Sequence, residues 1–175
     1  MKFWRWSNMP ADEFFAALMD ARGASEWREG QRALGRRVVF TNGVFDVLHA
    51  GHVQYLAWAR AQGDALVVGL NSDASVRALK GERRPIVPFA DRAMVLCALR
   101  SVDVVAEFGE ATPEKLLEAI RPDVHVKSAQ YREEDLPERG VVRAHGGVVL
   151  LAPHIGGRST SDIVDTILER YRPQA

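Results

Sequence analysis

Five short runs of apolar residues, separated by longer segments with helical spacing, limit the folds open to this chain. The runs are largely continuous rather than alternating in polarity, which is typical of strands that are covered on both faces. The intervening helices provide the crossovers that neighbouring parallel strands require. The pattern therefore predicts an α/β fold with a doubly wound, five-stranded parallel sheet of the Rossmann-like type. The predicted strands are residues 38–41, 65–70, 102–106, 124–127 and 148–151.

The remaining segments predict helices around this sheet. Residues 1–35 are expected to form an N-terminal helical extension, with a break at Gly23 and a second helical segment over residues 25–34. Its apolar residues at helical spacing are Phe14, Phe15, Leu18 and Met19. Residues 36–175 are expected to form a single α/β domain. The predicted core helices are 51–62, 90–99, 112–120 (which begins with the cap-like pair Thr112-Pro113) and 160–171.

Charge and composition narrow the range of partners. Lysine and arginine together number 23, as do aspartate and glutamate, so no global positive field would attract nucleic acid or an anionic membrane. The first six residues lack the apolar run of a secretory signal, and no stretch reaches membrane-spanning length. Cys97 is the single cysteine and lies in an apolar stretch, which favours a core position and a reducing compartment. We therefore expect a cytoplasmic protein without nucleic-acid or membrane partners.

The segment after the first predicted strand carries the main candidate phosphate site. It contains neither a G-x-x-x-x-G-K-[ST] loop nor a G-x-G-x-x-G turn. Instead, residues 41–52 lead directly into an amphipathic segment, so His49 and His52 lie at a predicted helix start. Free amides, the helix dipole and imidazole N–H groups favour phosphate at such a position, and Gly51 leaves room for it to approach the backbone.

Two other interpretations of these histidines remain open. One is a pair of surface residues, and the other is a zinc site, because i and i+3 spacing permits metal ligation. His125 and His145 would then have to supply further ligands. The first lies inside a predicted strand and the second beside an apparent glycine turn, which disfavours metal binding by histidines.

The same segment resembles a known family. His49-Ala50-Gly51-His52, together with Gly43, Phe45 and Asp46, is similar to the G-x-F-D-x-x-H-x-G-H pattern of the cytidylyltransferase-like nucleotidyltransferases. The resemblance implies that His49 and His52 are catalytic and contact the triphosphate and the α-phosphoryl transition state. It also implies a nucleotide-binding loop made of Asn42, Gly43, Val44, Phe45, Asp46 and Gly51.

A second candidate phosphate segment precedes the last predicted helix. Ser159 or Thr160 can cap that helix, and Asp162 completes a capping-box-like pattern, so capping alone would explain the hydroxyl groups. The segment also resembles the S-T-T or S-S-T phosphate loop of the family, which implies that it wraps the β- and γ-phosphates. The implied nucleotide-binding residues are Gly156, Arg158, Ser159, Thr160 and Ser161.

Further segments resemble the heptose 1-phosphate adenylyltransferase branch of the family. They are residues 40–46, 71–75, 79–81, 84–86, 91–92 and 121–123. This resemblance implies transfer of AMP from ATP to a sugar 1-phosphate, with D-glycero-β-D-manno-heptose 1-phosphate as the leading acceptor and pyrophosphate as the leaving group. Lys80 and Arg92 are implied catalytic phosphate ligands and Lys127 an implied nucleotide ligand. The other interpretation of these three residues is that each lies on the solvated surface or forms an ion pair. The implied acceptor-binding residues are Asn71, Asp73, Lys80 and Tyr131.

Two places in the sequence bear on the choice of nucleotide and on activity. His154 stands where cytidylyl relatives commonly carry arginine, which favours ATP over CTP. After the fourth predicted strand the chain has Ser128-Ala129-Gln130, where the heptose branch usually has two glycines and an aspartate. The alternatives are therefore a cytidylyltransferase acting on glycerol 3-phosphate or a phosphorylated amino alcohol, and a noncatalytic nucleotide-binding relative.

Magnesium is the expected cofactor. It would arrive with the nucleotide and keep phosphate oxygens and waters as ligands, so the chain needs few carboxylates for it. Asp46 is the candidate metal ligand, and its other interpretation is that it stabilises the Asn42-Gly43 turn by accepting backbone amides. A homodimer is a further expectation, with the tryptophans Trp4, Trp6 and Trp27 as candidate contacts.

Overall fold

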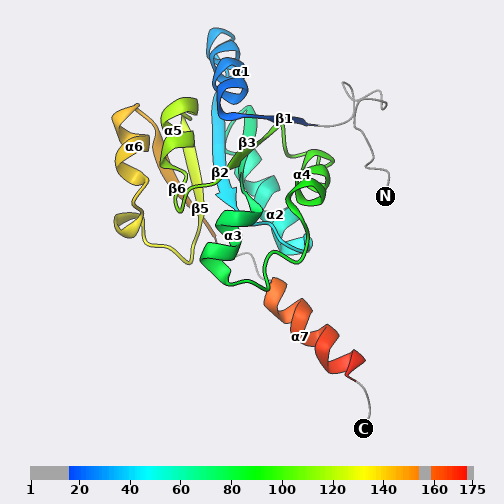
Figure 1. The fold of residues 1–175 in the computed structure, drawn as a ribbon. Helices are drawn as coiled ribbons and strands as arrows, with labels where there is room; N and C mark the ends of the chain where they lie inside the picture. Colours follow the sequence, from blue (N-terminus) through cyan, green and yellow to red (C-terminus); the bar gives the residue numbers. More distant parts are fainter. Residues whose placement is uncertain (1–15, 154–158, 173–175) are drawn as a thin grey trace, which may run out of the picture.

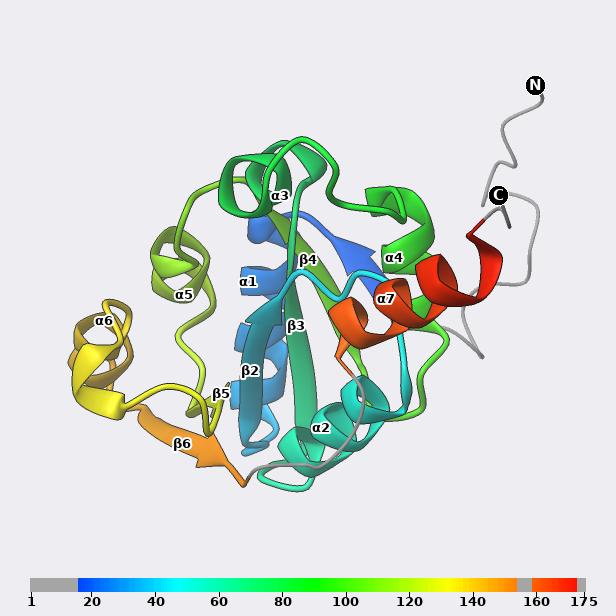
Figure 2. The ribbon, with the colours of Figure 1, turned by 90° about the horizontal axis from the view of Figure 1, so that it is seen from below.

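The computed structural model describes residues 16–153 and 159–172. Six parallel strands form one sheet in the order β1-β4-β3-β2-β5-β6, with helices on both faces (Figures 1 and 2). The strands are β1 (Ala17–Met19), β2 (Val38–Gly43), β3 (Ala65–Asn71), β4 (Val104–Phe108), β5 (Val124–Ser128) and β6 (Val148–Ala152). The helices are α1 (Ala21–Ala33), α2 (Ala50–Arg60), α3 (Asp73–Lys80), α4 (Phe89–Cys97), α5 (Glu114–Ile120), a short 3-10 turn (Glu133–Asp135), α6 (Arg139–Ala144) and α7 (Thr160–Tyr171). The predicted α/β fold with a parallel sheet is confirmed, but the sheet has six strands rather than five.

Two hydrophobic layers hold the helices on the sheet, because successive residues of a strand point to opposite faces. Val39 of β2 lies in one layer with Leu56 of α2 and Leu96 of α4. Its neighbour Phe40 lies in the other layer, with residues of α1, α5 and α6. Strands buried on both faces account for the continuous apolar runs in the sequence. Cys97 belongs to the first layer and is buried, as predicted.

The order of the strands creates a crevice at the carboxyl ends of the central strands. From β2 the chain proceeds outward through β3 and β4, and it then returns to β5 on the other side of β2. Thr41 of β2 is therefore aligned with Val68 of β3 and with Val126 of β5. The connections that leave β2 and β5 diverge, and open α/β sheets bind ligands outside the carboxyl ends of their strands at such a reversal.

The N-terminal segment differs from the prediction in two ways. Leu18 and Met19, expected in a helix, lie in the edge strand β1, because pairing with the open edge of β4 has outweighed the local helical spacing. Helix α1 also runs through Gly23 without a break. Asp20 caps α1 by accepting a hydrogen bond from the Gly23 amide at 2.7 Å, so this glycine lies in a stabilised first turn. The domain boundary at residue 35 remains a prediction, although β1 and α1 join the sheet and its covering layer.

The other predicted strands and helices are present with small shifts of their ends, and α3 and α6 are additional. The predicted strand 102–106 begins two residues later, as β4. The predicted cap of α5 is wrong by one residue, because Pro113 occupies the cap position without a side-chain hydrogen bond. Thr112 instead donates its hydroxyl to Glu114 Oε2 at 2.8 Å.

The last helix, α7, extends away from the carboxyl edge of the sheet rather than packing along one face (Figure 1). None of its residues is buried. A capping box closes its first turn, as predicted: Ser159 accepts from the Asp162 amide, and the Asp162 carboxylate accepts from the Ser159 amide. Within the described ranges, every helix is too short or too polar to cross a lipid bilayer.

Candidate functional site

A cavity of about 690 Å³ opens where β2, β3 and β5 end, at the point of strand-order reversal. Most of the predicted site residues line it. They are Asn42, Gly43, Val44, Phe45, Asp46, His49, Gly51, His52, Asn71, Lys80, Lys127, Tyr131, Ser159, Thr160 and Ser161. Asp73 and Arg92 do not line it, while His154, Gly156 and Arg158 lie outside the described residues. The fold thus brings together segments that are far apart in the sequence.

Helix α2 begins at the histidine pair. His49 is the N-cap of α2, and its Nδ1 accepts a hydrogen bond from the Gly51 amide at 3.2 Å. The His52 ring stacks on the His49 ring with 3.9 Å between their centroids. Burial, and secondarily the neighbouring His49, lowers the pKa of His52 to about 4. His52 is therefore neutral near pH 7 and carries one N–H that can be donated to a phosphate oxygen.

The loop between β2 and α2 has an uncommon backbone conformation. Phe45 and Val47 have φ angles of 46° and 49°, in the left-handed region that residues with side chains rarely adopt. The Phe45 ring is buried and meets the His52 ring edge-on at 5.3 Å. A Cβ atom at Gly43 would lie 3.0 Å from Phe45 Cε2, so a glycine there allows the ring to take this position. Strained loops of this kind are concentrated at ligand-binding sites.

Asp46 supports a neighbouring loop instead of offering free oxygens to a metal. Its buried carboxylate accepts hydrogen bonds from the amides of Ile86 and Val87 and pairs with Arg84 Nη1 at 3.0 Å. Both oxygens are engaged, so the predicted metal role does not fit this geometry. The other interpretation was right in kind, but the amides belong to a distant loop rather than to the turn at residues 42–43. Among the described residues, no cluster of three His, Cys, Asp or Glu could hold a metal, zinc included.

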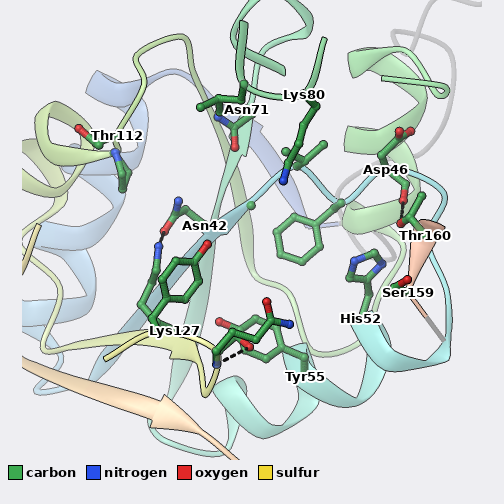
Figure 3. Close-up of a pocket in the computed structure, with 18 of the residues that line it drawn as sticks. Asn42, Asp46, His52, Tyr55, Asn71, Lys80, Thr112, Lys127, Ser159 and Thr160 are labelled. Atoms are coloured by element: carbon green, nitrogen blue, oxygen red, sulfur yellow. Dashed lines mark hydrogen bonds between the residues drawn. The ribbon is translucent and has the colours of Figure 1, made fainter. Parts of the chain in front are cut away.

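The cap residue and first residue of α7, Ser159 and Thr160, meet the histidine segment (residues 41–52) at the cavity (Figure 3). The Thr160 hydroxyl donates a hydrogen bond to the main-chain oxygen of Asp46 at 2.7 Å. Ser159 caps α7 and also lines the cavity. The amino ends of α2 and α7 therefore face one cavity, and each offers backbone amides and a positive helix end to an anion.

Two lysines line the cavity in different states. Lys80, at the end of α3, has neither an ion pair nor a hydrogen bond through its ammonium within the described part of the chain. Lys127 pairs with the buried Glu138 at 2.8 Å and donates to Asn42 Oδ1 at 3.2 Å. Its ammonium also lies 4.9 Å from the centre of the Tyr131 ring. The charge of Lys80 is thus available to a ligand, whereas that of Lys127 is partly neutralised by a carboxylate.

Arg92 is buried beneath the cavity, where it contacts residues that line it, but it does not line the cavity itself. It is 2% exposed and pairs with Asp73 at 2.7 Å. Its guanidinium also donates to the main-chain oxygens of Val44, Asn71 and Val87. All three nitrogens are engaged within the protein, so the predicted direct contact of Arg92 with phosphate does not fit. Asp73 pairs with Arg92 through one oxygen and does not line the cavity, and its role as a ligand of the acceptor substrate stays a prediction. The ion-pair interpretation of Arg92 fits instead.

The cavity also contains residues outside the predicted set. The Tyr55 hydroxyl donates to Val126 O at 3.0 Å and lies 2.7 Å from the Thr41 hydroxyl, which joins α2 to the sheet. Burial raises the pKa of Tyr55 to about 12. Its position three residues after His52, on one helix face, is a sequence signal that indicates a shared site. Glu138 has no such local signal, because its burial depends on the packing of distant segments.

Comparison with known proteins places this geometry in a family. Residues 40–152, more than half of the chain, match the family described as Cytidylyltransferase-like. The chain belongs to this family. The matched cytidylyltransferase-like region contains the histidine segment and the strands β3 to β6, and it ends before the segment that caps α7.

Curated relatives are similar over most of this cytidylyltransferase-like chain. The bifunctional protein HldE of Geobacter metallireducens is 50% identical over 156 residues, which are 89% of this chain and 32% of that protein. HldE of Citrifermentans bemidjiense is 52% identical over 141 residues, covering 81% and 29% of the two chains. HldE of Halorhodospira halophila is 46% identical over 161 residues, covering 92% and 34%. The chain thus spans about a third of the length of these relatives.

Solved structures have a similar fold. A lipopolysaccharide core biosynthesis protein from Thermoplasma volcanium has a TM-score of 0.58 and 27% identity, covering 71% of this chain and 100% of that one. A pantoate-beta-alanine ligase from Francisella tularensis, solved with β-γ ATP and β-alanine, has a TM-score of 0.56 and 12% identity, covering 91% and 80%. The second likeness is of the fold alone.

Proposed function

We propose that this chain transfers AMP from ATP to the phosphate of a sugar 1-phosphate, with D-glycero-β-D-manno-heptose 1-phosphate as acceptor, and releases pyrophosphate. One observation carries the proposal: the amino ends of α2 and α7 face a single cavity, tied by the 2.7 Å hydrogen bond from Thr160 to Asp46. Two helix ends with free amides suit the several charges of one triphosphate. Membership of the cytidylyltransferase-like family supports nucleotidyl transfer.

The proposed reaction joins two phosphates. An oxygen of the acceptor phosphate attacks the α-phosphorus of ATP and forms a new P–O bond. The bond from the α-phosphorus to the oxygen that bridges to the β-phosphorus breaks, and its electron pair leaves with pyrophosphate. The attacking oxygen is already anionic near neutral pH, so no strong general base is required. Catalysis then depends on positioning and on stabilising the charge that moves to pyrophosphate.

Three side chains are suited to that stabilisation. Burial lowers the pKa of His52 to about 4, so its ring is neutral near pH 7. A neutral ring can donate one hydrogen bond to the triphosphate, and it needs no counter-ion when the nucleotide is absent. His49 lines the cavity at the first turn of the same helix. Lys80 has no carboxylate partner in the described part of the chain, so its full charge can meet the triphosphate. The amides at the start of α7 add neutral donors for the β- and γ-phosphates.

Magnesium enters this proposal as part of the nucleotide substrate. The predicted metal ligand, Asp46, is engaged by Arg84 and by the amides of Ile86 and Val87. An ion bound by phosphate oxygens and waters needs no such carboxylate. Lys80 and the two helix ends would neutralise charge that remains on the MgATP complex.

The acceptor would occupy the part of the cavity next to β5. Heptose 1-phosphate is favoured because residues 71–75 and 79–81 resemble the heptose branch of the family, and the curated relatives HldE cover this region. Ser128 and Ala129 replace the glycines usual in that branch. Neither has a positive φ, so the backbone here does not require glycine. These two substitutions therefore impose no backbone strain where β5 ends.

Pyrophosphate release is the direct test. ATP and CTP would each be paired with heptose 1-phosphate, other sugar 1-phosphates, glycerol 3-phosphate and phosphoethanolamine. We expect release with ATP and heptose 1-phosphate, and no release when excess EDTA removes magnesium. Turnover only with CTP and glycerol 3-phosphate or phosphoethanolamine would identify a cytidylyltransferase. Binding of ATP without turnover of any pair would identify a noncatalytic relative.

A further inference from the structure

Asn42 lies near the end of β2, where two side chains of β5 approach its amide oxygen. His125 Nε2 lies 3.3 Å from Asn42 Oδ1, and Lys127 Nζ donates to the same oxygen at 3.2 Å. His125 is fully buried, whereas Asn42 lines the cavity. A core histidine is thus connected to the cavity wall through one amide group.

Proton chemistry decides which way the Asn42 amide faces. Lysine can only donate, so the Asn42 atom next to Lys127 must be the oxygen. His125 must then carry its proton on Nε2 in order to donate to that oxygen. Its Nδ1 is left with a lone pair, and this buried atom has no hydrogen-bond partner within the residues described. Burial, and secondarily Lys127, lowers the pKa of His125 to about 3, so the ring stays neutral near pH 7.

The amide nitrogen of Asn42 is consequently free for a ligand. Figure 3 shows the oxygen turned toward Lys127 and the nitrogen turned away from it. That nitrogen has no partner in the described part of the chain. We propose that Asn42 Nδ2 binds a phosphate oxygen of the acceptor substrate and that His125 is a positioning residue that, together with Lys127, holds the amide in this orientation. This assignment rests on the proposed function, whose acceptor site it specifies.

Location and charge indicate which phosphate the amide meets. Asn42 and Lys127 lie on one side of the cavity, and His52 and Thr160 lie on the other (Figure 3). A triphosphate held by the amino ends of α2 and α7 leaves the β5 side to the acceptor. There the Asn42 N–H offers a neutral donor, and the Lys127 ammonium, which lies 3.2 Å from Asn42 Oδ1, adds a positive charge to the same side of the cavity.

A role in folding alone does not account for His125. Burying an imidazole with one unpartnered nitrogen costs free energy that an apolar residue of similar size would not cost. The contact with Asn42 also adds little to the joining of β2 and β5, because main-chain pairing already aligns Thr41 with Val126. The arrangement is better explained by what it does to the amide that faces the cavity.

Calorimetric titration of the whole chain tests this assignment without depending on turnover. The nucleotide site is first saturated with α,β-methylene-ATP, and heptose 1-phosphate and inorganic phosphate are then titrated separately. His125→Met removes the donor at similar volume, whereas His125→Gln keeps an N–H near the place of Nε2. We expect His125→Met to lower the affinity for heptose 1-phosphate and for inorganic phosphate about tenfold. His125→Gln should restore both affinities to within about threefold of those of the unaltered chain. The affinity for the ATP analogue should change by less than about twofold in either variant.

Two further variants make the result decisive. His145→Met is the matched control, because His145 interacts with Glu118 outside the cavity, and it should leave all affinities unchanged. Asn42→Asp places a charged oxygen where the amide nitrogen was, and it should abolish phosphate binding even if His125→Met fails to fold.

The assignment is overturned by any of three results. The first is that His125→Met binds phosphate as tightly as the unaltered chain does. The second is that acceptor and nucleotide affinities fall together in that variant, and the third is that the unaltered chain loaded with the analogue binds neither phosphate. If the binding pattern is as expected but pyrophosphate is never released, the proposed reaction fails while the assignment of Asn42 and His125 stands.

Discussion

The hydroxyl of Thr160 donates a hydrogen bond to the main-chain oxygen of Asp46 over 2.7 Å, joining positions 114 residues apart. The side chain of Asp46 in turn accepts from the amides of Ile86 and Val87. One residue thus connects the start of α7 with the loops before α2 and α4. None of the residues of α7 is buried, so this bond helps to fix where its amino end lies.

Replacing Thr160 with valine removes that donor and keeps the branched shape. We expect the KM for ATP to rise about tenfold and the free energy of unfolding to fall by about 1 kcal/mol. Thr160→Ser retains the hydroxyl and should stay close to the unaltered chain in both respects. Steady-state pyrophosphate release and denaturant unfolding would measure the two effects. Equal KM values for the two variants would mean that this hydrogen bond does not position the amino end of α7 for binding ATP.

His52→Ala tests the histidine segment. Loss of a preorganised donor to the transition state should reduce kcat by roughly 10²-fold or more. His52 is not fully buried, so circular dichroism should show an intact fold. His145→Ala provides a matched histidine outside the cavity and should keep full activity. A His52→Ala enzyme that retains most of its kcat would contradict the assigned role.

Lys80→Met tests the cation that has no partner among the described residues. We expect kcat/KM for ATP to fall about 10²-fold, with little change in melting temperature, because no intramolecular contact of the ammonium is lost. Arg83→Met is the matched control, since Arg83 is exposed on the same segment and does not line the cavity. Comparable losses in both variants would indicate a general electrostatic effect rather than a contact made by Lys80.

Arg92→Lys should show the opposite pattern, with stability affected first. A lysine cannot reproduce the fork that reaches Val44, Asn71 and Asp73, and buried oxygens would lose their donors. We expect the free energy of unfolding to fall by about 3 kcal/mol, and turnover to fall as the loop after β2 loosens. Urea unfolding measures the first effect. A variant with unchanged stability but lost turnover would restore the direct phosphate role for Arg92.

The central strands could be predicted because both of their faces are buried. Every residue of β3 is buried, so its apolar run has one interpretation. Strand β1 could not be predicted in the same way. It has three residues, two of them exposed, and it exists because it pairs with β4 at an open edge. Pairing between distant segments leaves no period in the local sequence, so helical spacing there was misleading.

The candidate site shows the same division. The histidine segment and the serine-threonine segment (Ser159–Ser161) are contiguous patterns at helix starts, and their position at the cavity could be predicted from their neighbours in the sequence. Whether a single basic residue would line the cavity or form internal contacts could not be predicted from the sequence. Lys80 and Arg92 both lie in segments that match the family, yet Arg92 is buried against main-chain oxygens and Lys80 lines the cavity. The partner of Lys127, Glu138, likewise depends on how α6 packs.

Two shielded histidines should make the stability of the fold depend on pH. Burial lowers the pKa of His52 to about 4 and that of His125 to about 3, from an ordinary value of 6.5. Below pH 6.5 the unfolded chain therefore binds protons that the folded chain excludes. The contribution of these groups to stability is fully present above that pH and is lost as the pH falls through the window down to about 3.

His125→Met isolates one of these protons. Where the unfolded state holds one proton more than the folded state, the free energy of unfolding changes by about 1.4 kcal/mol per pH unit. Between about pH 5 and pH 6, the unaltered chain should therefore lose stability more steeply than the variant, by a slope approaching that value. Denaturant unfolding at a series of pH values measures both slopes. Parallel slopes would mean that His125 takes up its proton in the folded chain, which contradicts a buried neutral ring held against Asn42.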